Sequence, residues 1–267
     1  MSDLVSIFVE DHIADVRLNR PDKYNALSFD MMDAIADAIG KLAKEPGVRV
    51  VVLSGEGKGF CAGLDLENFA AFQSGEKKLP DLRERYESRI TNLYQHIAYG
   101  WKELPMPVIA AIHGGALGGG FQIAMGADIR FCTPDAKLSA MEMKWGLIPD
   151  MSLTQTLRDL VSIDVAKELV FTAKVVRGEE AARLKLVTHV CEKPYDEAMV
   201  LAKEIASKNP DAVRAAKKLL NGAWHGDSAR GFMMESEIMM TVMGTPNQVE
   251  AISANFSGQP PTFKDPV

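Results

Sequence analysis

The architecture of this chain follows from two glycine-rich stretches, GFCAGLDL at residues 59–66 and HGGALGGG at residues 113–120. Each comes directly after an apolar run, Arg49–Leu53 or Val108–Ile112, that is typical of a strand buried on both faces. Glycine lets backbone N–H groups approach a ligand closely, and a helix beginning at the second stretch would add partial positive charge. Two such turns side by side would direct two N–H donors at one oxygen, forming an oxyanion hole. Glycines that only permit tight strand–helix packing would give the same pattern, so both interpretations stay open.

Strands and helices alternate around these stretches. The further predicted strands, of which the first two form a hairpin, are Val5–Glu10, Ile13–Leu18, Ile129–Cys132 and Lys137–Ala140. Ser28 is expected to cap a helix that runs to Lys44, and Glu76–Tyr99 predicts a charged amphipathic helix. Beyond Pro149 only helical patterns remain: Ser152–Val161, Val165–Ala173, Glu179–Lys185, Asp196–Ser207, Asp211–Trp224, Ser228–Met243 and Pro246–Phe256. The sequence therefore predicts an α/β fold followed by a helical region.

Composition and charge argue against several classes of protein. The 267 residues include 30 Lys and Arg against 36 Asp and Glu, a net charge of −6, and nucleic-acid phosphates would need a basic face. Cys61, Cys132 and Cys191 are too few and too scattered for a disulfide framework, so we expect a reducing, cytoplasmic location. Residues 104–127 carry no charge, but prolines and glycines interrupt them, so no membrane partner is expected. The sequence lacks the common nucleotide-binding and nucleophile-elbow motifs, and its scattered histidines predict no metal site.

The full set of motifs, in order, resembles the crotonase (enoyl-CoA hydratase/isomerase) superfamily over nearly the whole chain. Both glycine-rich stretches belong to this resemblance, and the other matching segments are Leu18-Asn19-Arg20-Pro21, Asn25-Ala26-Leu27, Ala127-Asp128-Ile129, Lys137–Pro149 and Phe263-Lys264. The resemblance implies an α/β fold with a crotonase-like spiral of ββα units at residues 1–195 and a C-terminal helical region at residues 196–267. It also implies an acyl-CoA substrate, no prosthetic group, coenzyme A as part of the substrate thioester, and a homotrimer or a dimer of trimers.

The resemblance also assigns roles within the glycine-rich stretches. The oxyanion donors would be the backbone N–H groups of Leu64 and Gly119, which lie in the two turns identified above from the residues alone. Coenzyme A would pack against two segments, with the contact residues Lys23, Asn25, Ala26, Leu27, Ala62, Leu64, Asp65 and Leu66. The alternative interpretation of the first segment is a simple helix entry, capped by Asn25 or Ser28.

The candidate catalytic acids depart from the family pattern. Hydratases of the family carry two glutamates; Glu142 matches one of them, whereas Gln122 stands at the position of the other. A glutamine amide cannot take up and return a proton near neutral pH, which argues against hydration by a two-glutamate mechanism. Eight residues after Glu142 comes Asp150, where many members of the family have glycine and dienoyl-CoA isomerases have an acid.

Three arrangements of the site remain open. Glu142 alone could move a proton between C2 and C4 of an enoyl-CoA, or Glu142 and Asp150 could act as a pair in isomerisation or hydration. The site could also bind acyl-CoA without turnover. Asp150 has an alternative role as the N-cap of a helix that begins near Ser152. Methionines gathered with Phe232 in the predicted helix Ser228–Met243 indicate core packing or subunit contact, or an acyl pocket shared between subunits.

Overall fold

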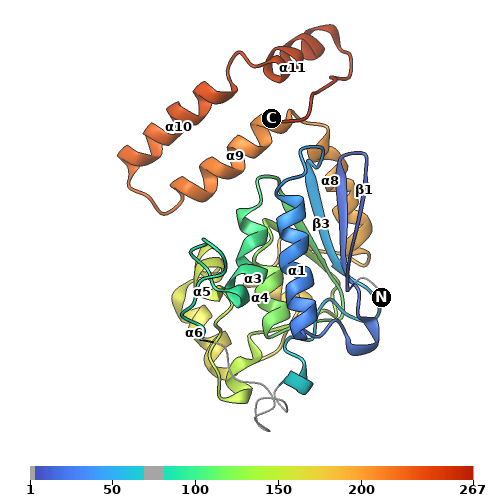
Figure 1. Ribbon diagram of the computed structural model, residues 1–267, viewed down its shortest axis with the longest axis vertical. Coiled ribbons are helices and arrows are strands. Elements are labelled where there is room, and N and C mark those ends of the chain that lie inside the picture. The colour runs from blue at the N-terminus through green and yellow to red at the C-terminus, as the bar shows by residue number, and fades with distance from the viewer. Residues whose placement is uncertain (1–3, 69–80, 267) are drawn as a thin grey trace.

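The apolar runs of the sequence pair into one six-stranded sheet, as the computed structural model shows for residues 4–68 and 81–266, the part of the chain that it describes (Figure 1). The strand order is β1-β2-β3-β4-β6-β9. β1 (Val5–Glu10) and β2 (Ile13–Leu18) form the predicted antiparallel hairpin. The strands that follow are parallel: β3 (Val50–Gly55), β4 (Val108–Ile112), β6 (Ile129–Cys132) and β9 (His189–Val190).

A second, three-stranded sheet grows out of the glycine-rich stretches. It contains β5 (Gly115–Leu117), β7 (Lys137–Ser139) and β8 (Val176–Arg177), in that order. Two isolated parallel bridges, Leu27 to Leu64 and Cys61 to Ala116, join the first glycine-rich stretch to its neighbours. The sequence predicted β7 but not β5, β8 or β9. β5 lies within the second glycine-rich stretch, and β8 and β9, with two residues each, are too short to show a hydrophobic period.

The central strands β3 and β4 of the large sheet are buried on both faces, as their apolar runs predicted. Residues of β3 alternate between two core clusters, with Val51 and Leu53 on one side and Val50 and Val52 on the other. The first face is covered by α1 (Phe29–Leu42), α3 (Leu93–Glu103) and α4 (Gly119–Met125), and the second by α8 (Pro194–Ala206) (Figure 1). The Ser28 side chain accepts a hydrogen bond from the Met31 amide, so the predicted cap of α1 is confirmed. This packing fixes the ends of β3 and β4, where both glycine-rich turns begin.

The helix predicted over Glu76–Tyr99 begins much later than expected. Residues 69–80 lie outside the described residues, and residues 81–92 form turns and bends rather than a helix. α3 begins at Leu93 because Asn92 and Gln95 form a capping box, in which each side chain accepts a hydrogen bond from the other residue's backbone N–H. The charged run ahead of Asn92 was therefore wrongly interpreted as helical.

The segment between the site and the C-terminal region consists of short helices. They are η2 (Met141–Trp145), α5 (Leu153–Thr156), η3 (Leu157–Asp159), α6 (Ile163–Thr172) and α7 (Gly178–Arg183). Another short helix, η1 (Pro21–Lys23), lies near the N-terminus. The single helix predicted over Ser152–Val161 is wrong, because the chain tightens after α5 into a 3-10 turn. The Leu160 amide then donates to the Leu157 carbonyl at 3.0 Å, three residues back.

Three C-terminal helices stand away from the sheets at one end of the molecule (Figure 1). They are α9 (Pro210–Ala223), α10 (Ser228–Val242) and α11 (Pro246–Ser257), and each lies within one residue of its predicted bounds. The proposed division between residues 195 and 196 falls within α8, which packs on the sheet. No helix in the described ranges is both long enough and apolar enough to cross a membrane.

Candidate active site

The two glycine-rich turns lie against each other. A Cβ atom at Gly63, where φ is +87°, would lie 2.6 Å from the Leu117 carbonyl oxygen and 3.4 Å from the Gly119 nitrogen. Only glycine allows so close an approach in this left-handed conformation. The sequence pattern alone left tight packing and donor presentation as alternatives, and the structure shows that the packing brings the two predicted donor segments together.

The Leu64 and Gly119 amides have no acceptor among the described residues. The bridge between Leu27 and Leu64 uses the Gly63 carbonyl, which accepts from the Leu27 amide at 2.8 Å, and the Asp65 amide, which donates to the Leu27 carbonyl at 3.2 Å. The Leu64 amide takes no part in this pairing. Gly119 is the first residue of α4, where the backbone N–H has no partner within the helix. Both residues line the same cavity.

That cavity has a volume of about 800 Å³ and lies between the first glycine-rich turn, the start of α4 and the η2 segment. Its lining includes seven of the eight residues predicted to contact coenzyme A: Lys23, Ala26, Leu27, Ala62, Leu64, Asp65 and Leu66. The predicted acids Glu142 and Asp150 line it too. The structure therefore brings the predicted donors, acids and most predicted contact residues to one space large enough for a small-molecule ligand.

Asn25 is the one predicted contact residue that lies outside the cavity lining. It is fully buried, and its side-chain oxygen accepts from the Arg20 amide at 2.8 Å. Its side-chain nitrogen donates to the carbonyl oxygens of Glu56, Gly59 and Phe60, at 2.9, 2.9 and 3.1 Å. Asn25 therefore ties the N-terminal segment to the start of the first glycine-rich stretch and so positions that stretch.

Asp65 is held in place by Arg20 at the edge of the cavity. The Arg20 guanidinium donates to Asp65 Oδ2 at 2.5 Å, and the same nitrogen also contacts the Ala26 carbonyl. Burial alone would raise the pKa of Asp65, but the Glu67 amide and Arg20 outweigh it and lower that pKa. Asp65 is therefore a fixed carboxylate that orders the loop beside Leu64.

Glu142 lines the cavity, and its two carboxyl oxygens have different surroundings. Its Oε1 atom accepts a hydrogen bond from the Gln122 side-chain nitrogen at 2.7 Å, whereas Oε2 is buried without a partner among the described residues. Burial raises the pKa of Glu142; its own backbone N–H and Gln122 oppose that rise, and the nearby charge of Asp150 adds to it. An acid with one oxygen held and the other free suits the transfer of a proton to and from a ligand.

Gln122 lies behind Glu142 rather than in the cavity lining. It is fully buried on α4, and its side-chain oxygen accepts from the Met151 and Leu153 amides, at 3.0 and 3.3 Å. These two bonds fix which end of the amide faces Glu142, so the nitrogen must donate. The sequence predicted Gln122 as a site residue, and the structure places it where it orients and hydrogen-bonds the acid.

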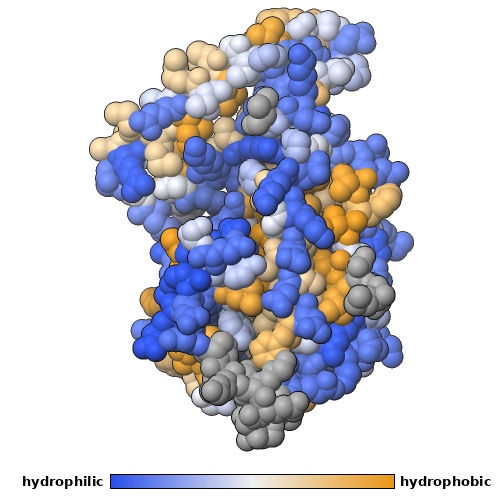
Figure 2. All heavy atoms as spheres, viewed as in Figure 1, coloured by the Kyte–Doolittle hydropathy of each residue, from blue (hydrophilic) through white to orange (hydrophobic). Residues whose placement is uncertain are grey.

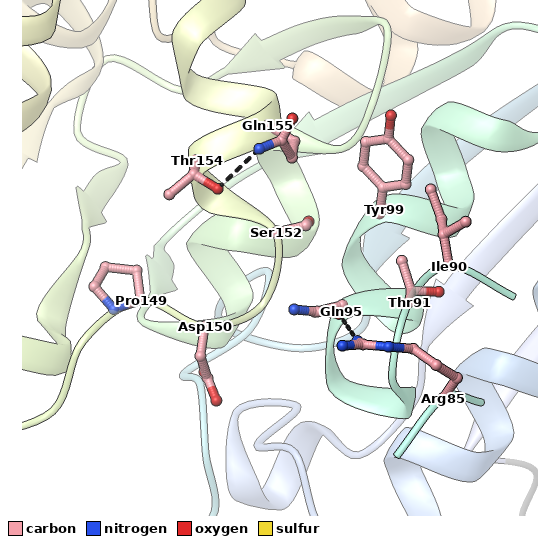
Figure 3. A pocket seen from close by; sticks show the side chains of 10 residues that line it. All are labelled: Arg85, Ile90, Thr91, Gln95, Tyr99, Pro149, Asp150, Ser152, Thr154 and Gln155. Carbon is pink, nitrogen blue, oxygen red and sulfur yellow. Dashed lines mark hydrogen bonds between the residues drawn. The ribbon is translucent and has the colours of Figure 1, made fainter. Parts of the chain in front are cut away.

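Asp150 lies at the junction of the large cavity with a second, smaller one (Figure 3). It does not cap the following helix: the residue at the cap position of α5 is Ser152, and no side chain makes a capping hydrogen bond there. Burial raises the pKa of Asp150. Tyr94, which the sequence analysis did not single out, also lines the large cavity, and burial together with the charge of Asp150 raises its pKa. No local motif could have identified Tyr94, because its place depends on α3 packing beside the Asp150 loop.

Comparison with known proteins agrees with this geometry. The family model described as Enoyl-CoA hydratase/isomerase matches residues 9–266. Mitochondrial methylglutaconyl-CoA hydratase of Mus musculus is 34% identical over 254 residues, covering 92% of this chain and 78% of that protein. Mitochondrial Delta(3,5)-Delta(2,4)-dienoyl-CoA isomerase of Homo sapiens is 33% identical over 250 residues, with 92% and 76% covered. The crystal structure of enoyl-CoA hydratase from Bacillus anthracis matches with a TM-score of 0.87 at 30% identity, covering 97% of this chain and 98% of that one.

The chain has an α/β fold in which two glycine-rich turns and the acid Glu142 line one cavity. This combination is the basis for assigning the class of protein. The chain belongs to the enoyl-CoA hydratase/isomerase family and is an acyl-CoA enzyme of that type, with the crotonase fold that its motifs predicted.

Proposed function

We propose that the protein moves the double bond of an enoyl-CoA thioester, with Glu142 as the base and the Leu64 and Gly119 amides as an oxyanion hole. Glu142 Oε2 removes a proton from C2 of a 3-enoyl thioester, and the electron pair of the broken C–H bond delocalises onto the thioester oxygen. The protonated Glu142 then returns the proton to C4, the double bond becomes C2=C3, and the carbonyl re-forms. No water, oxidant or second substrate is consumed.

The observation that carries this proposal is that the two carboxyl oxygens of Glu142 have different hydrogen-bond partners. Gln122 donates to Oε1, and the Gln122 side chain is itself fixed by two backbone amides, so Oε2 is the carboxyl oxygen left without a hydrogen-bond partner among the described residues. One base serves both ends of an allylic proton shift, whereas hydration needs a group that orients or deprotonates water as well. The two backbone donors stabilise the enolate oxygen, and such a donor contributes about 3 kcal/mol to transition-state stabilisation.

The test compares wild-type protein and Glu142→Gln on a 3-enoyl-CoA, with formation of the conjugated 2-enoyl thioester followed by ultraviolet absorbance. We expect kcat to fall by about 10³-fold, because a positioned general acid–base group contributes that much, while KM changes little. Lys144→Gln is the matched control, since Lys144 is exposed on the same short helix and does not line the cavity. Turnover by Glu142→Gln at the wild-type rate would remove Glu142 from the mechanism.

Asp150 favours a second candidate, in which Glu142 and Asp150 act as a pair. Both acids line the cavity, and the charge of Asp150 acts on Glu142. Such a pair suits a dienoyl-CoA isomerisation or a hydration. Assays of 3,5-dienoyl-CoA and 2-enoyl-CoA separate the candidates, because Asp150→Asn abolishes turnover only if the second acid moves a proton. If Asp150→Asn retains wild-type turnover of all three substrate types, the single-base mechanism stands.

The mode of coenzyme A binding and the assembly are part of the same proposal. Coenzyme A enters with the substrate and packs on the segments that contain Lys23 and Leu66, which line the cavity mouth. We further propose a homotrimer or a dimer of trimers, supported by apolar side chains left exposed on α10 (Figure 2). The cytoplasmic location is proposed on the three cysteines, which are all free thiols.

A further inference from the structure

The smaller cavity beside Asp150 has a volume of about 400 Å³ and a polar lining (Figure 3). One wall comes from residues 85–99 and the other from residues 149–155, and the side chains of the two walls face each other across the space. Among the described residues, Asp150 alone lines both this cavity and the large one, so the two cavities are neighbours at Asp150.

Two hydroxyl groups in this lining are buried without hydrogen-bond partners among the described residues. Thr91 and Ser152 are 6% and 9% exposed, and neither side-chain oxygen makes a bond. Burying an unpaired hydroxyl costs free energy, so such groups are uncommon unless a ligand or water satisfies them. Both lie on the lining of the same cavity, on opposite walls.

The cavity lining also contains a cation, Arg85, that forms no ion pair with a described residue, although the Asp150 carboxylate lines the same cavity. Within the described residues Arg85 makes one side-chain hydrogen bond, a long one of 3.4 Å to Gln95 Oε1, and no ion pair. Gln95 Oε1 is already occupied by the Asn92 amide, whereas the Gln95 side-chain nitrogen has no partner among the described residues. In Figure 3 that nitrogen points away from Arg85, toward the opposite wall. The unpaired groups of Arg85, Gln95, Thr91 and Ser152 can all donate hydrogen bonds.

We propose that this cavity binds the far end of an acyl chain that terminates in a carboxylate, so that the preferred substrates are coenzyme A monothioesters of dicarboxylic acids. A carboxylate only accepts hydrogen bonds, and it matches a lining of unpaired donors with one cation. This inference rests on the proposed function, because it places the acyl carbons next to Glu142 and the chain end beyond Asp150. Arg85 stands on the wall opposite Asp150, which separates the terminal carboxylate from the catalytic acids (Figure 3).

The experiment measures binding of saturated acyl-CoAs, which cannot react, by calorimetry. Succinyl-, glutaryl- and adipyl-CoA are compared with butyryl-, pentanoyl- and hexanoyl-CoA, which have the same numbers of carbons. We expect the best dicarboxylic ligand to bind at least ten-fold more tightly than its monocarboxylic counterpart. Arg85→Gln should abolish that difference and leave the Kd of the monocarboxylic ligands within two-fold of wild type.

Two further variants provide a matched control and a second test of the cavity. Arg83→Gln is the matched control, because Arg83 is paired with Asp81 on the surface and does not line the cavity; it should leave all affinities unchanged. Thr91→Val should weaken only the dicarboxylic ligands while leaving Tm equal to or above that of wild type, since it removes an unpaired buried hydroxyl.

The outcomes separate this inference from the proposed function. Equal affinity for both series in wild-type protein overturns the carboxylate subsite alone. The proposed isomerase function would still stand if the same preparation isomerises a 3-enoyl-CoA. A loss of affinity for both series in Arg85→Gln also overturns it, because Arg85 would then contact the coenzyme A portion. Failure of the wild-type protein to bind any of the six ligands would overturn both proposals.

Discussion

Gln122, a neutral side chain, hydrogen-bonds the Glu142 carboxyl group and so affects both its orientation and its pKa. Its nitrogen donates to Glu142 Oε1, and this bond favours the carboxylate over the neutral acid. Burial of Glu142 acts in the opposite direction and prevails, so its pKa stays above the ordinary value for glutamate. The proposed base is therefore more strongly basic than an exposed carboxylate while it remains in one orientation.

The pH dependence of turnover should report this balance. The base is active when deprotonated, so kcat/KM falls as the pH drops through the pKa of Glu142. Gln122→Leu removes a hydrogen bond that lowers this pKa, so we expect the acidic limb of the profile to move to higher pH and the plateau to fall. Lys144→Gln should leave the limb in place. An unmoved limb in Gln122→Leu would show that the bond to Glu142 does not govern the titration.

The same position should control hydration. In Gln122→Glu two carboxyl groups lie at hydrogen-bond distance and share a proton, which provides the second acid that the native chain lacks at this position. We expect hydration of a 2-enoyl-CoA, followed as loss of absorbance, to increase at least ten-fold. Gln122→Met, which cannot ionise, should show no gain. If Gln122→Glu also gains nothing, the missing acid is not what limits hydration.

The sequence predicted which residues come together around the cavity better than how their side chains are held there. Glu142 was found through the motif around it, and Leu64 and Gly119 through the glycines beside them. The role of Gln122 was not predictable, because its side-chain oxygen is held by the Met151 and Leu153 amides, 29 and 31 residues away in the sequence. The smaller cavity was missed for the same reason, since its two walls are at least 50 residues apart in the sequence.

Among the elements, strands and long helices followed the sequence closely, and short ones did not. β3 and the hairpin of β1 and β2 were predicted because burial imposes a repeating pattern over five or six residues. The start of α3 was misplaced because charged residues at helical spacing were given more weight than the capping box at Asn92 and Gln95. Local polar bonds, rather than amphipathic spacing, set that boundary.

A buried lysine, together with Arg214 and Asn221, attaches α9 to the rest of the molecule. Lys217 donates to Asp128 Oδ2 at 2.7 Å and to the carbonyl oxygens of Met106 and Trp101, at 2.9 and 3.2 Å. It is only 8% exposed, and burial lowers its pKa. The bonds join α9 to the end of α3 and to the segments that precede β4 and β6.

Replacing this lysine should loosen the helical region. Lys217→Met leaves one carboxylate and two carbonyl oxygens without their donor, so we expect the free energy of unfolding to fall by about 2 kcal/mol. Chemical denaturation measures the change. The neighbouring Lys218 is exposed, and Lys218→Met is the matched control that should change stability little. Equal effects of the two substitutions would mean that the buried bonds contribute nothing specific.

At the scale of the whole molecule, the C-terminal helices leave an apolar surface uncovered. α10 has no buried residue, and its exposed side chains include Phe232, Met233, Met239 and Met240; Met243, directly after it, is exposed too (Figure 2). None of these side chains lines either cavity, so within one chain they do not contribute to the acyl pocket that the sequence suggested as one possible role. An exposed apolar surface of this kind is typical of a protein–protein contact.

Measured mass in solution should therefore show self-association. Light scattering on eluted protein should give three or six times the mass of one chain. Phe232→Glu combined with Met240→Glu should reduce the mass to that of a single chain, because two charges would be buried at the contact. Val200→Glu, at an equally exposed apolar position on α8, is the control and should keep the wild-type mass. Wild-type protein with the mass of one chain would refute the proposed assembly.

The close contact at Gly63 has a consequence for how such an enzyme can change. The proposed grip on the thioester uses main-chain atoms, and it requires the glycine at 63 that lets the two turns approach. The side chains at 122, 142 and 150 do not supply these donors; they determine where the proton goes while the donors stabilise the enolate. The two tasks are thus separable in the chain, and a few substitutions can redirect the reaction while the substrate stays in the same pose.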